Sequence, residues 1–337
     1  MPEPTGNRLI QGLIRNPLVI LLIVIVIAVQ VTTGSLLNWQ NLRSVLMDGA
    51  VITIVAIPCA MLIISGYIDL SVGSTLALGG VVGGMIMNEG AGNPALAVLA
   101  AIGAGALVGL FNAVATCYFG LSAFITTLGT LTAVRGVAQL LSPLPRNSFG
   151  DAFGFLGVGT VAGIPVSVWI AGIFLIAAGL VLVHTPAGRH IYAIGVNREA
   201  AYLSGVSVRR IPFVLFVLSG AAAGFAGTVT AARLNSAPAG QLGLGFELAV
   251  LTAVLLGGIA LTGGEGSMFG VLIGVLFLGV LNNALTLIGV TSFWQNVASG
   301  LALVAAIGLS AYTHVLRQRL EAREAKRLAE LATPVSS

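Results

Sequence analysis

The polar residues with the clearest chemical potential occupy one short segment between two apolar stretches. Residues 65–74 read Ser-Gly-Tyr-Ile-Asp-Leu-Ser-Val-Gly-Ser, so Asp69 and Ser71 fall where the connection is too short for an ordinary loop. A broken helix of this kind can line a cavity, where its polar groups meet a polar solute. The alternative is that Asp69 caps the next helix by accepting backbone N–H groups near Val72. The two interpretations are compatible.

A second group of polar residues lies further along the chain. Phe124, Thr126, Thr127 and Thr130 belong to an apolar stretch that also contains Arg135. At helical spacing the threonine hydroxyls either line one face or bond back to their own helix. A charge such as that of Arg135 is costly inside a membrane span, so it either faces protein or water or extends to the membrane interface.

Two amides, Asn282 and Asn283, lie in a late apolar stretch. A pathway lined by amides, hydroxyls and aromatic rings suits a neutral polyhydroxylated solute. An ion-coupled carrier usually places acids or histidines deep in its spans, whereas Asp48, Asp69 and Glu247 lie near the ends of apolar stretches. This pattern disfavours proton-coupled transport. The predicted substrate pathway comprises Asp69, Ser71, Phe124, Thr126, Thr127, Thr130, Asn282 and Asn283.

The composition excludes several classes of protein. Of the 337 residues, 57% are hydrophobic and 8% are charged, against about a quarter charged in soluble proteins, which indicates a polytopic membrane protein. Lys326 is the only lysine and lies in Glu-Ala-Lys-Arg, so the chain has no GxxxxGK[ST] phosphate-binding loop and no ATPase site of its own. Cys59 and Cys117 lie in apolar stretches, which predicts neither a metal site nor a disulfide framework. We also predict no bound cofactor and no nucleic-acid partner.

Apolar stretches of about 20 residues, long enough to cross a bilayer, recur along the chain. We predict an all-α polytopic membrane protein with ten transmembrane helices, at residues 17–37, 47–66, 70–88, 94–118, 121–141, 164–183, 212–232, 247–262, 268–289 and 293–313. The transmembrane domain thus covers residues 17–313, between an N-terminal segment, 1–16, and a C-terminal tail, 314–337. A longer inner loop, 184–211, divides it into halves of five spans, an arrangement that permits two inverted repeats.

The distribution of basic residues predicts the orientation. With the N-terminus inside, the inner segments carry 11 of the 15 Lys and Arg residues, and the outer segments carry three, Arg43, Arg146 and Arg233. Cytoplasmic loops are the ones enriched in Lys and Arg. Both termini are therefore expected in the cytoplasm.

The inner loop contains the pattern of a short helix. Residues 197–205 read Asn-Arg-Glu-Ala-Ala-Tyr-Leu-Ser-Gly, a run of helix formers closed by a glycine. Such a helix on the cytoplasmic side either docks into a groove on a partner or connects two spans.

Four blocks of the sequence, in order, resemble the permease subunits of bacterial sugar ABC importers of the ribose, xylose and arabinose type. Residues 66–74 match the family's G-x-x-DLSVG-S pattern, and residues 124–136 match FIxTLGTL…RG. Residues 188–205 match GR…G-x-N-x-x-AA-x-x-SG, and residues 257–283 match GG…L-x-GG-x-G-S…G-x-x-N. Glu265 occupies the open position of this last pattern, where sugar permeases often carry Arg or another residue.

The resemblance implies a permease in the bacterial inner membrane that pairs with a second copy or a paralogue. It implies a separate ATP-binding cassette subunit that hydrolyses ATP and a periplasmic sugar-binding protein that delivers a small neutral sugar. The residues that it assigns to ATPase docking are Asn197, Arg198, Glu199, Ala200, Ala201, Ser204 and Gly205. The alternatives are an ion-coupled secondary transporter of a small polar solute and a permease of the branched-chain amino-acid type.

Overall fold

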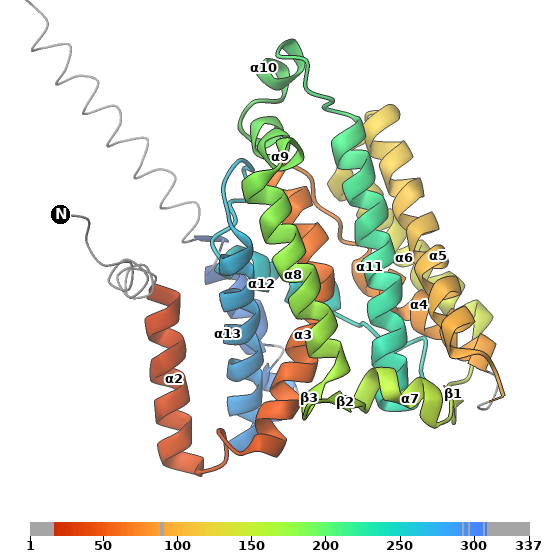
Figure 1. The fold of residues 1–337 in the computed structure, drawn as a ribbon, viewed down its shortest axis with the longest axis vertical. Coiled ribbons are helices and arrows are strands. Elements are labelled where there is room, and N and C mark those ends of the chain that lie inside the picture. The colour runs from red at the N-terminus through yellow and green to blue at the C-terminus, as the bar shows by residue number, and fades with distance from the viewer. Residues whose placement is uncertain (1–16, 88–90, 292, 296, 306, 309–337) are drawn as a thin grey trace, which may run out of the picture.

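The computed structural model describes residues 17–87, 91–291, 293–295, 297–305 and 307–308. The described chain is a helical bundle (Figure 1). Its helices are α2 (Pro17–Thr33), α3 (Trp39–Ile64), α4 (Val72–Met87), α5 (Pro94–Ala113), α6 (Ala123–Leu141), α7 (Asp151–Val158), α8 (Val166–His184), α9 (Pro186–Val196), α10 (Arg198–Leu203), α11 (Arg210–Leu234), α12 (Phe246–Leu256) and α13 (Met268–Leu287). A π-helical turn, η2 (Val114–Tyr118), extends α5.

Short strands close two loops at one end of the bundle. Strand β1 (Arg146–Asn147) pairs antiparallel with β4 (Ser236–Ala237), and β2 (Thr160–Val161) pairs antiparallel with β3 (Ile164–Pro165). Together with α7 they form the end of the molecule opposite to α9 and α10 (Figure 1). Arg146, which the charge distribution places outside, and the predicted inner loop, 184–211, thus lie at opposite ends.

Six described helices are long and apolar enough to cross a membrane: α3, α5 with η2, α6, α8, α11 and α13. Three shorter apolar helices, α2, α4 and α12, coincide with the predicted spans 17–37, 70–88 and 247–262. They have 17, 16 and 11 residues, fewer than the roughly 20 of a full crossing. The tenth predicted span, 293–313, extends beyond the described residues. The polytopic helical class is confirmed, whereas the count of ten is not.

The first long helix begins earlier than predicted. Helix α3 starts at Trp39 rather than near residue 47, because the Asn38 side chain caps it by accepting the backbone N–H of Gln40 at 3.1 Å. The polar residues that interrupt the apolar pattern here have partners. Arg43 donates to the carbonyl of Val158, and Asp48 pairs with Arg233 at the end of α11.

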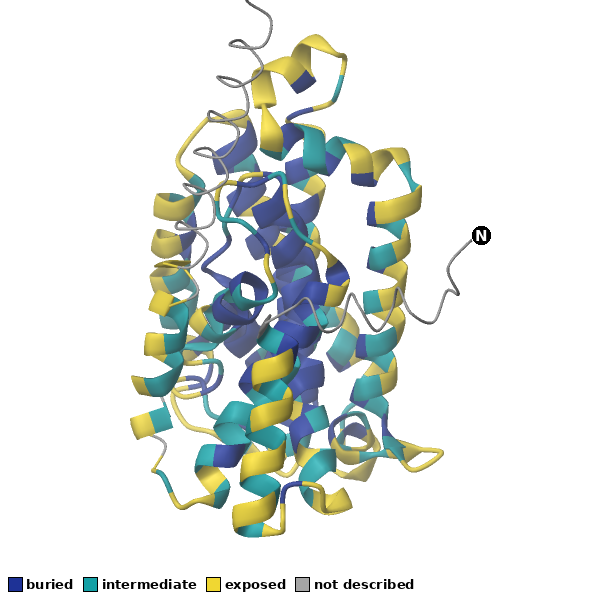
Figure 2. Cartoon of the chain, turned by 90° about the vertical axis from the view of Figure 1, so that its left-hand side faces the viewer, coloured by how far each residue is buried: buried dark blue, intermediate teal, exposed yellow. Residues whose placement is uncertain are grey.

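Helix α3 forms the centre of the core. Every residue from 53 to 64 is buried, and Figure 2 shows the buried residues concentrated along the middle of the bundle. Helices α8, α11, α12 and α13 all pack against α3. A helix that is apolar on all sides suits such a position, surrounded by other apolar helices.

Glycines allow α11 to approach α5 and α4 with direct contact between backbones. A Cβ atom on Gly105 would collide with the carbonyl of Gly220, and one on Gly79 would collide with Gly224. The spacings Gly105/Gly109 and Gly220/Gly224 place small residues on one face of each helix, which permits this approach.

This packing predicts opposite effects for two neighbouring glycines of α5. Gly105→Ala is expected to destabilise the protein by about 1–3 kcal/mol, because the methyl group meets an immobile backbone carbonyl. Gly103→Ala should leave stability unchanged or higher, since nothing lies near its Cβ position and alanine favours helix. Thermal unfolding of the purified protein in detergent measures both. Equal melting temperatures for the two variants would contradict the described packing.

Candidate functional site

The Asp69 carboxylate accepts three hydrogen bonds inside the protein. Its Oδ1 accepts from the backbone N–H of Ser71 at 2.9 Å and from the Ser71 hydroxyl at 2.6 Å. Its Oδ2 accepts from the hydroxyl of Ser219 on α11 at 2.7 Å. Because Ser71 directly precedes α4, these bonds hold the turn at which α4 begins. Asp69 thus forms an Asx turn directly before α4, and its backbone partner is Ser71 rather than a residue of the helix itself.

The same hydrogen bonds continue into two further helices. The Ser71 hydroxyl accepts from the amide of Asn112 on α5 at 2.9 Å, and the Asn112 Oδ1 accepts from the hydroxyl of Thr130 on α6 at 2.7 Å. Asp69, Ser71, Asn112, Thr130 and Ser219 are all buried, and we refer to these five residues as the polar network. It joins α11, the turn before α4, α5 and α6 inside the bundle.

Sequence reasoning missed two members of the polar network. Asn112 and Ser219 each stand alone in apolar helices, so their spacing gives no pattern. The available signal was their polarity, because a polar side chain buried among apolar helices needs a hydrogen-bond partner.

Two predicted pathway residues line a cavity of about 800 Å³ between α4, α5 and α6. Thr126 and Thr130 belong to its wall together with Ser122, and the remainder is largely apolar, including the exposed side chains of Leu107, Phe111 and Ile125. We call it the lateral cavity. Thr130 therefore belongs both to this wall and to the polar network.

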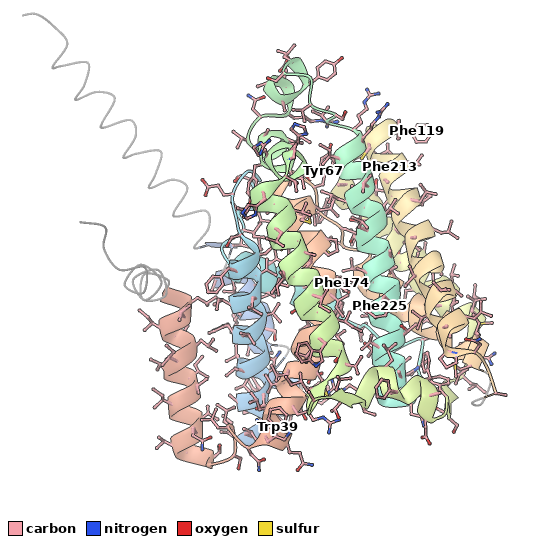
Figure 3. The ribbon with its side chains drawn as sticks, viewed as in Figure 1. Trp39, Tyr67, Phe119, Phe174, Phe213 and Phe225 are labelled. Carbon is pink, nitrogen blue, oxygen red and sulfur yellow. The ribbon has the colours of Figure 1, made fainter. Side chains whose placement is uncertain are left out.

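Phe124 lines a different and smaller cavity near α10. This cavity has a volume of about 330 Å³, and its wall includes Tyr67, Thr116, Ser122 and Arg198. We call it the α10 cavity. Figure 3 shows Tyr67 at the end of the bundle where α9 and α10 lie, on the same side as Phe119 and Phe213.

The remaining predicted pathway residues lie elsewhere. The hydroxyl of Thr127 donates to the carbonyl of Ala123 at 2.8 Å, so it bonds back to its own helix. Asn283 exchanges two hydrogen bonds of 2.8 Å with Asn41, near the start of α3, and Asn282 accepts from Ser299 at 3.3 Å. Since α3 has 26 residues, its two ends lie about 39 Å apart. The structure does not bring these amides to the polar network.

Arg135 faces protein rather than the membrane interface. Its guanidinium donates to the carbonyl of Ala239 at 3.1 Å and to that of Gly243 at 3.0 Å, and it also donates to the carbonyl of Leu242. It thereby fixes the segment that leads into α12. Of the two interpretations of this charge, the structure supports the one in which it faces protein.

The predicted short helix of the inner loop is confirmed as α10. Asn197 caps it, with Oδ1 accepting the backbone N–H of Ala200 at 2.9 Å, and Gly205 ends it with a φ of 81°. A positive φ suits glycine because a side chain would clash with the backbone. Ser204 donates to the carbonyl of Ala200 at 2.9 Å.

The two sides of α10 have different surroundings. Ala201 is buried against Ile194 and Val208, so this side attaches α10 to α9 and to the start of α11. On the other side Glu199 and Ala200 are exposed. Three apolar side chains next to them are largely exposed as well: Val196 at 73%, Tyr202 at 66% and Leu203 at 79%. We call these three residues the α10 tip, and sequence reasoning had not assigned them to docking.

The glycine-rich segment before α13 packs beneath α9. The backbone N–H of Gly264 donates to the carbonyl of Ile64 at 2.8 Å, and the Tyr192 hydroxyl donates to the carbonyl of Gly266 at 2.8 Å. Burial raises the pKa of Tyr192 above its ordinary value. The motif segments 188–205 and 257–267 thus meet at the α10 end of the bundle, and Tyr67 of segment 66–74 lies beside Arg198 there.

Comparison with known proteins gives a consistent result. Residues 41–307 match the family model described as branched-chain amino acid transport system / permease component. The chain is 38% identical over 300 residues to the ribose import permease protein of Escherichia coli (strain K12), covering 88% of this chain and 93% of that protein. It is 32% identical over 314 residues to the L-arabinose ABC transporter permease protein of Azospirillum brasilense, covering 91% of this chain and 90% of that protein. No solved structure matches the chain.

A third relative supports the same branch. The D-allose transport system permease protein of Escherichia coli (strain K12) is 32% identical over 292 residues, covering 86% of this chain and 89% of that protein. The range matched by the family model, residues 41–307, includes the turn before α4, α6, α10 and the segment beneath α9. The chain therefore belongs to the permease family of ABC importers, in the branch of the ribose-type sugar permeases.

Proposed function

We propose that this chain is the permease subunit of an ABC importer that carries a small neutral sugar, a pentose, a hexose or a related polyol, across the bacterial inner membrane. The observation that carries the proposal is the match to 93% of a ribose import permease at 38% identity. The chemistry agrees with a neutral solute, because the polar network consists of hydroxyls, one amide and one carboxylate that is already hydrogen-bonded.

The importer requires partners that this chain does not supply. A separate ATP-binding cassette subunit hydrolyses ATP, since the sequence contains no phosphate-binding loop. This subunit docks on α10 at the cytoplasmic end, and a periplasmic sugar-binding protein delivers the solute at the end formed by α7 and the short strands. Under this orientation both termini are cytoplasmic.

A second permease copy or a paralogue completes the membrane unit. The lateral cavity is lined largely by apolar groups, among them the exposed side chains of Leu107, Phe111 and Ile125. Lipid alone would leave the Thr126 hydroxyl in an apolar surrounding, whereas a second permease can supply a polar partner and form the path between the two copies.

The test is uptake into proteoliposomes that contain this chain together with its ATPase and binding protein. We expect accumulation of D-ribose, L-arabinose or D-allose only when ATP is present with the ATPase and the binding protein is present on the opposite side. Uptake driven by an ion gradient without ATP would instead identify a secondary transporter. The name of the family model favours one further candidate substrate, so L-leucine is included; uptake of leucine in place of the sugars would identify an amino-acid permease.

A further inference from the structure

The α10 cavity differs chemically from the lateral cavity. Its wall combines two aromatic rings, Tyr67 and Phe124, with the hydroxyl-bearing residues Thr116 and Ser122 and the guanidinium of Arg198. Ser122 is the N-cap residue of α6, yet its side chain makes no capping hydrogen bond. With about 330 Å³, the cavity falls at the lower end of the range for small-molecule sites.

Two hydroxyls in this wall have no hydrogen-bond partner. The Tyr67 and Thr116 side chains are 8% and 5% exposed, and the hydroxyl oxygen of each is buried without a partner in the described structure. Both hydroxyls are covered by their neighbours in this conformation. A buried unpaired hydroxyl is unfavourable by about 1–3 kcal/mol, and native proteins contain few of them, so two in the wall of one cavity require an explanation.

Arg198 connects this wall to the proposed docking helix. It is the first residue of α10, and its guanidinium carbon lies 5.8 Å from the centre of the Tyr67 ring. Tyr67 also makes an edge-to-face contact with Phe216, at 6.0 Å between ring centres. A displacement of α10 therefore moves Arg198 away from a ring that is otherwise fixed.

We propose that the α10 cavity is a binding subsite for a neutral polyol at the inner end of the translocation path. The hydroxyls of Tyr67 and Thr116 are covered in this conformation, and they become available to the solute when α10 moves Arg198 away from the Tyr67 ring. The solute hydroxyls then satisfy both groups, and the aromatic rings contact its C–H faces. This inference rests on the function proposed above and names a site for that solute.

The first experiment separates a solute-binding role from a packing role. Tyr67→Phe and Thr116→Val remove only the hydroxyls and keep the shape of each side chain. Because an unpaired buried hydroxyl stabilises nothing, we expect the melting temperature of the purified complex to stay equal or rise. Sugar uptake by the complex with its ATPase and binding protein is expected to fall about fivefold, the effect of one lost neutral hydrogen bond.

Tyr118→Phe is the control, since Tyr118 is exposed and contacts Phe213 instead. Unchanged uptake in both variants, or uptake and melting temperature falling together, would overturn the proposal.

The second experiment does not depend on transport. Thr116→Cys is introduced after Cys59 and Cys117 are replaced by alanine, and the complete complex is treated with N-ethylmaleimide. We expect slow labelling at rest, faster labelling during ATP turnover, and slower labelling again when millimolar D-ribose, L-arabinose or D-allose is added. Labelling at one rate under all conditions, or protection by inorganic phosphate but by none of the sugars, would refute the subsite. Protection by a sugar without any uptake would leave the subsite standing and would count against the transport function alone.

Discussion

Replacing Asp69 with alanine is expected to remove most of the folded protein from the membrane. The variant leaves three buried donors without an acceptor: the N–H and hydroxyl of Ser71 and the hydroxyl of Ser219. Each unpaired buried donor costs about 1–3 kcal/mol, so their sum approaches the typical total stability of about 5–15 kcal/mol. Membrane abundance measured by immunoblotting should fall about tenfold or more.

Asp69→Asn is the matched control for this prediction. Its amide oxygen can still accept both bonds from Ser71, and Ser219 can accept from the new NH₂ group. We expect at least about half of the normal abundance, since only one of the three acceptor positions changes to a donor. Equal loss in the two variants would mean that charge, rather than the hydrogen-bond geometry, holds the turn. Normal abundance with abolished uptake in Asp69→Asn would mean that the carboxylate itself contacts the solute, as in the cavity interpretation.

Replacing Leu203 with aspartate is expected to uncouple the permease from its ATPase. The Leu203 side chain is 79% exposed at the α10 tip, so the change leaves the fold of this chain intact. In a docked complex the same side chain would be buried, where a leucine contributes about 1.5–3 kcal/mol and an unpaired carboxylate is strongly unfavourable. Affinity for the ATPase, and with it sugar uptake, should fall more than about tenfold, whereas membrane abundance should not change.

Ser207→Asp is the control for the α10 tip. Ser207 is exposed in the turn after α10, so it adds the same charge at the same end of the molecule without touching the tip. Uptake should remain close to that of the unchanged protein. A similar loss in both variants would indicate a general effect of charge at this end, and no loss in Leu203→Asp would exclude the tip from docking.

Local patterns of the sequence were sufficient for some parts of the structure. The short helix at 197–205 follows from its capping asparagine and closing glycine, because both act on neighbouring residues. The start of α3 could not be placed in the same way. Its first turns contain Arg43 and Asp48, whose partners Val158 and Arg233 lie more than a hundred residues away in the sequence. A hydropathy pattern does not reveal such distant partners.

In the candidate site, too, some residues could be predicted from the local sequence and others could not. Asp69 and Ser71 were identified because they interrupt an apolar region, and Thr130 was identified from its spacing. Asn112 and Ser219 complete the polar network from other helices, and only the packing of α5 and α11 against the turn before α4 reveals them. The sequence also could not tell which side of α10 is attached, since Ala200 and Ala201 are chemically identical while one is exposed and the other buried.

The most direct test of the account is photo-crosslinking from the α10 tip in intact cells. A photoreactive phenylalanine analogue replaces Leu203 in one strain and Phe155 of α7 in another, both at exposed positions and at opposite ends of the bundle (Figure 1). Docking at the α10 tip predicts an adduct with the ATP-binding cassette subunit from position 203 and none from position 155. An adduct with that subunit from position 155, or its absence from position 203 at normal membrane abundance, would contradict it.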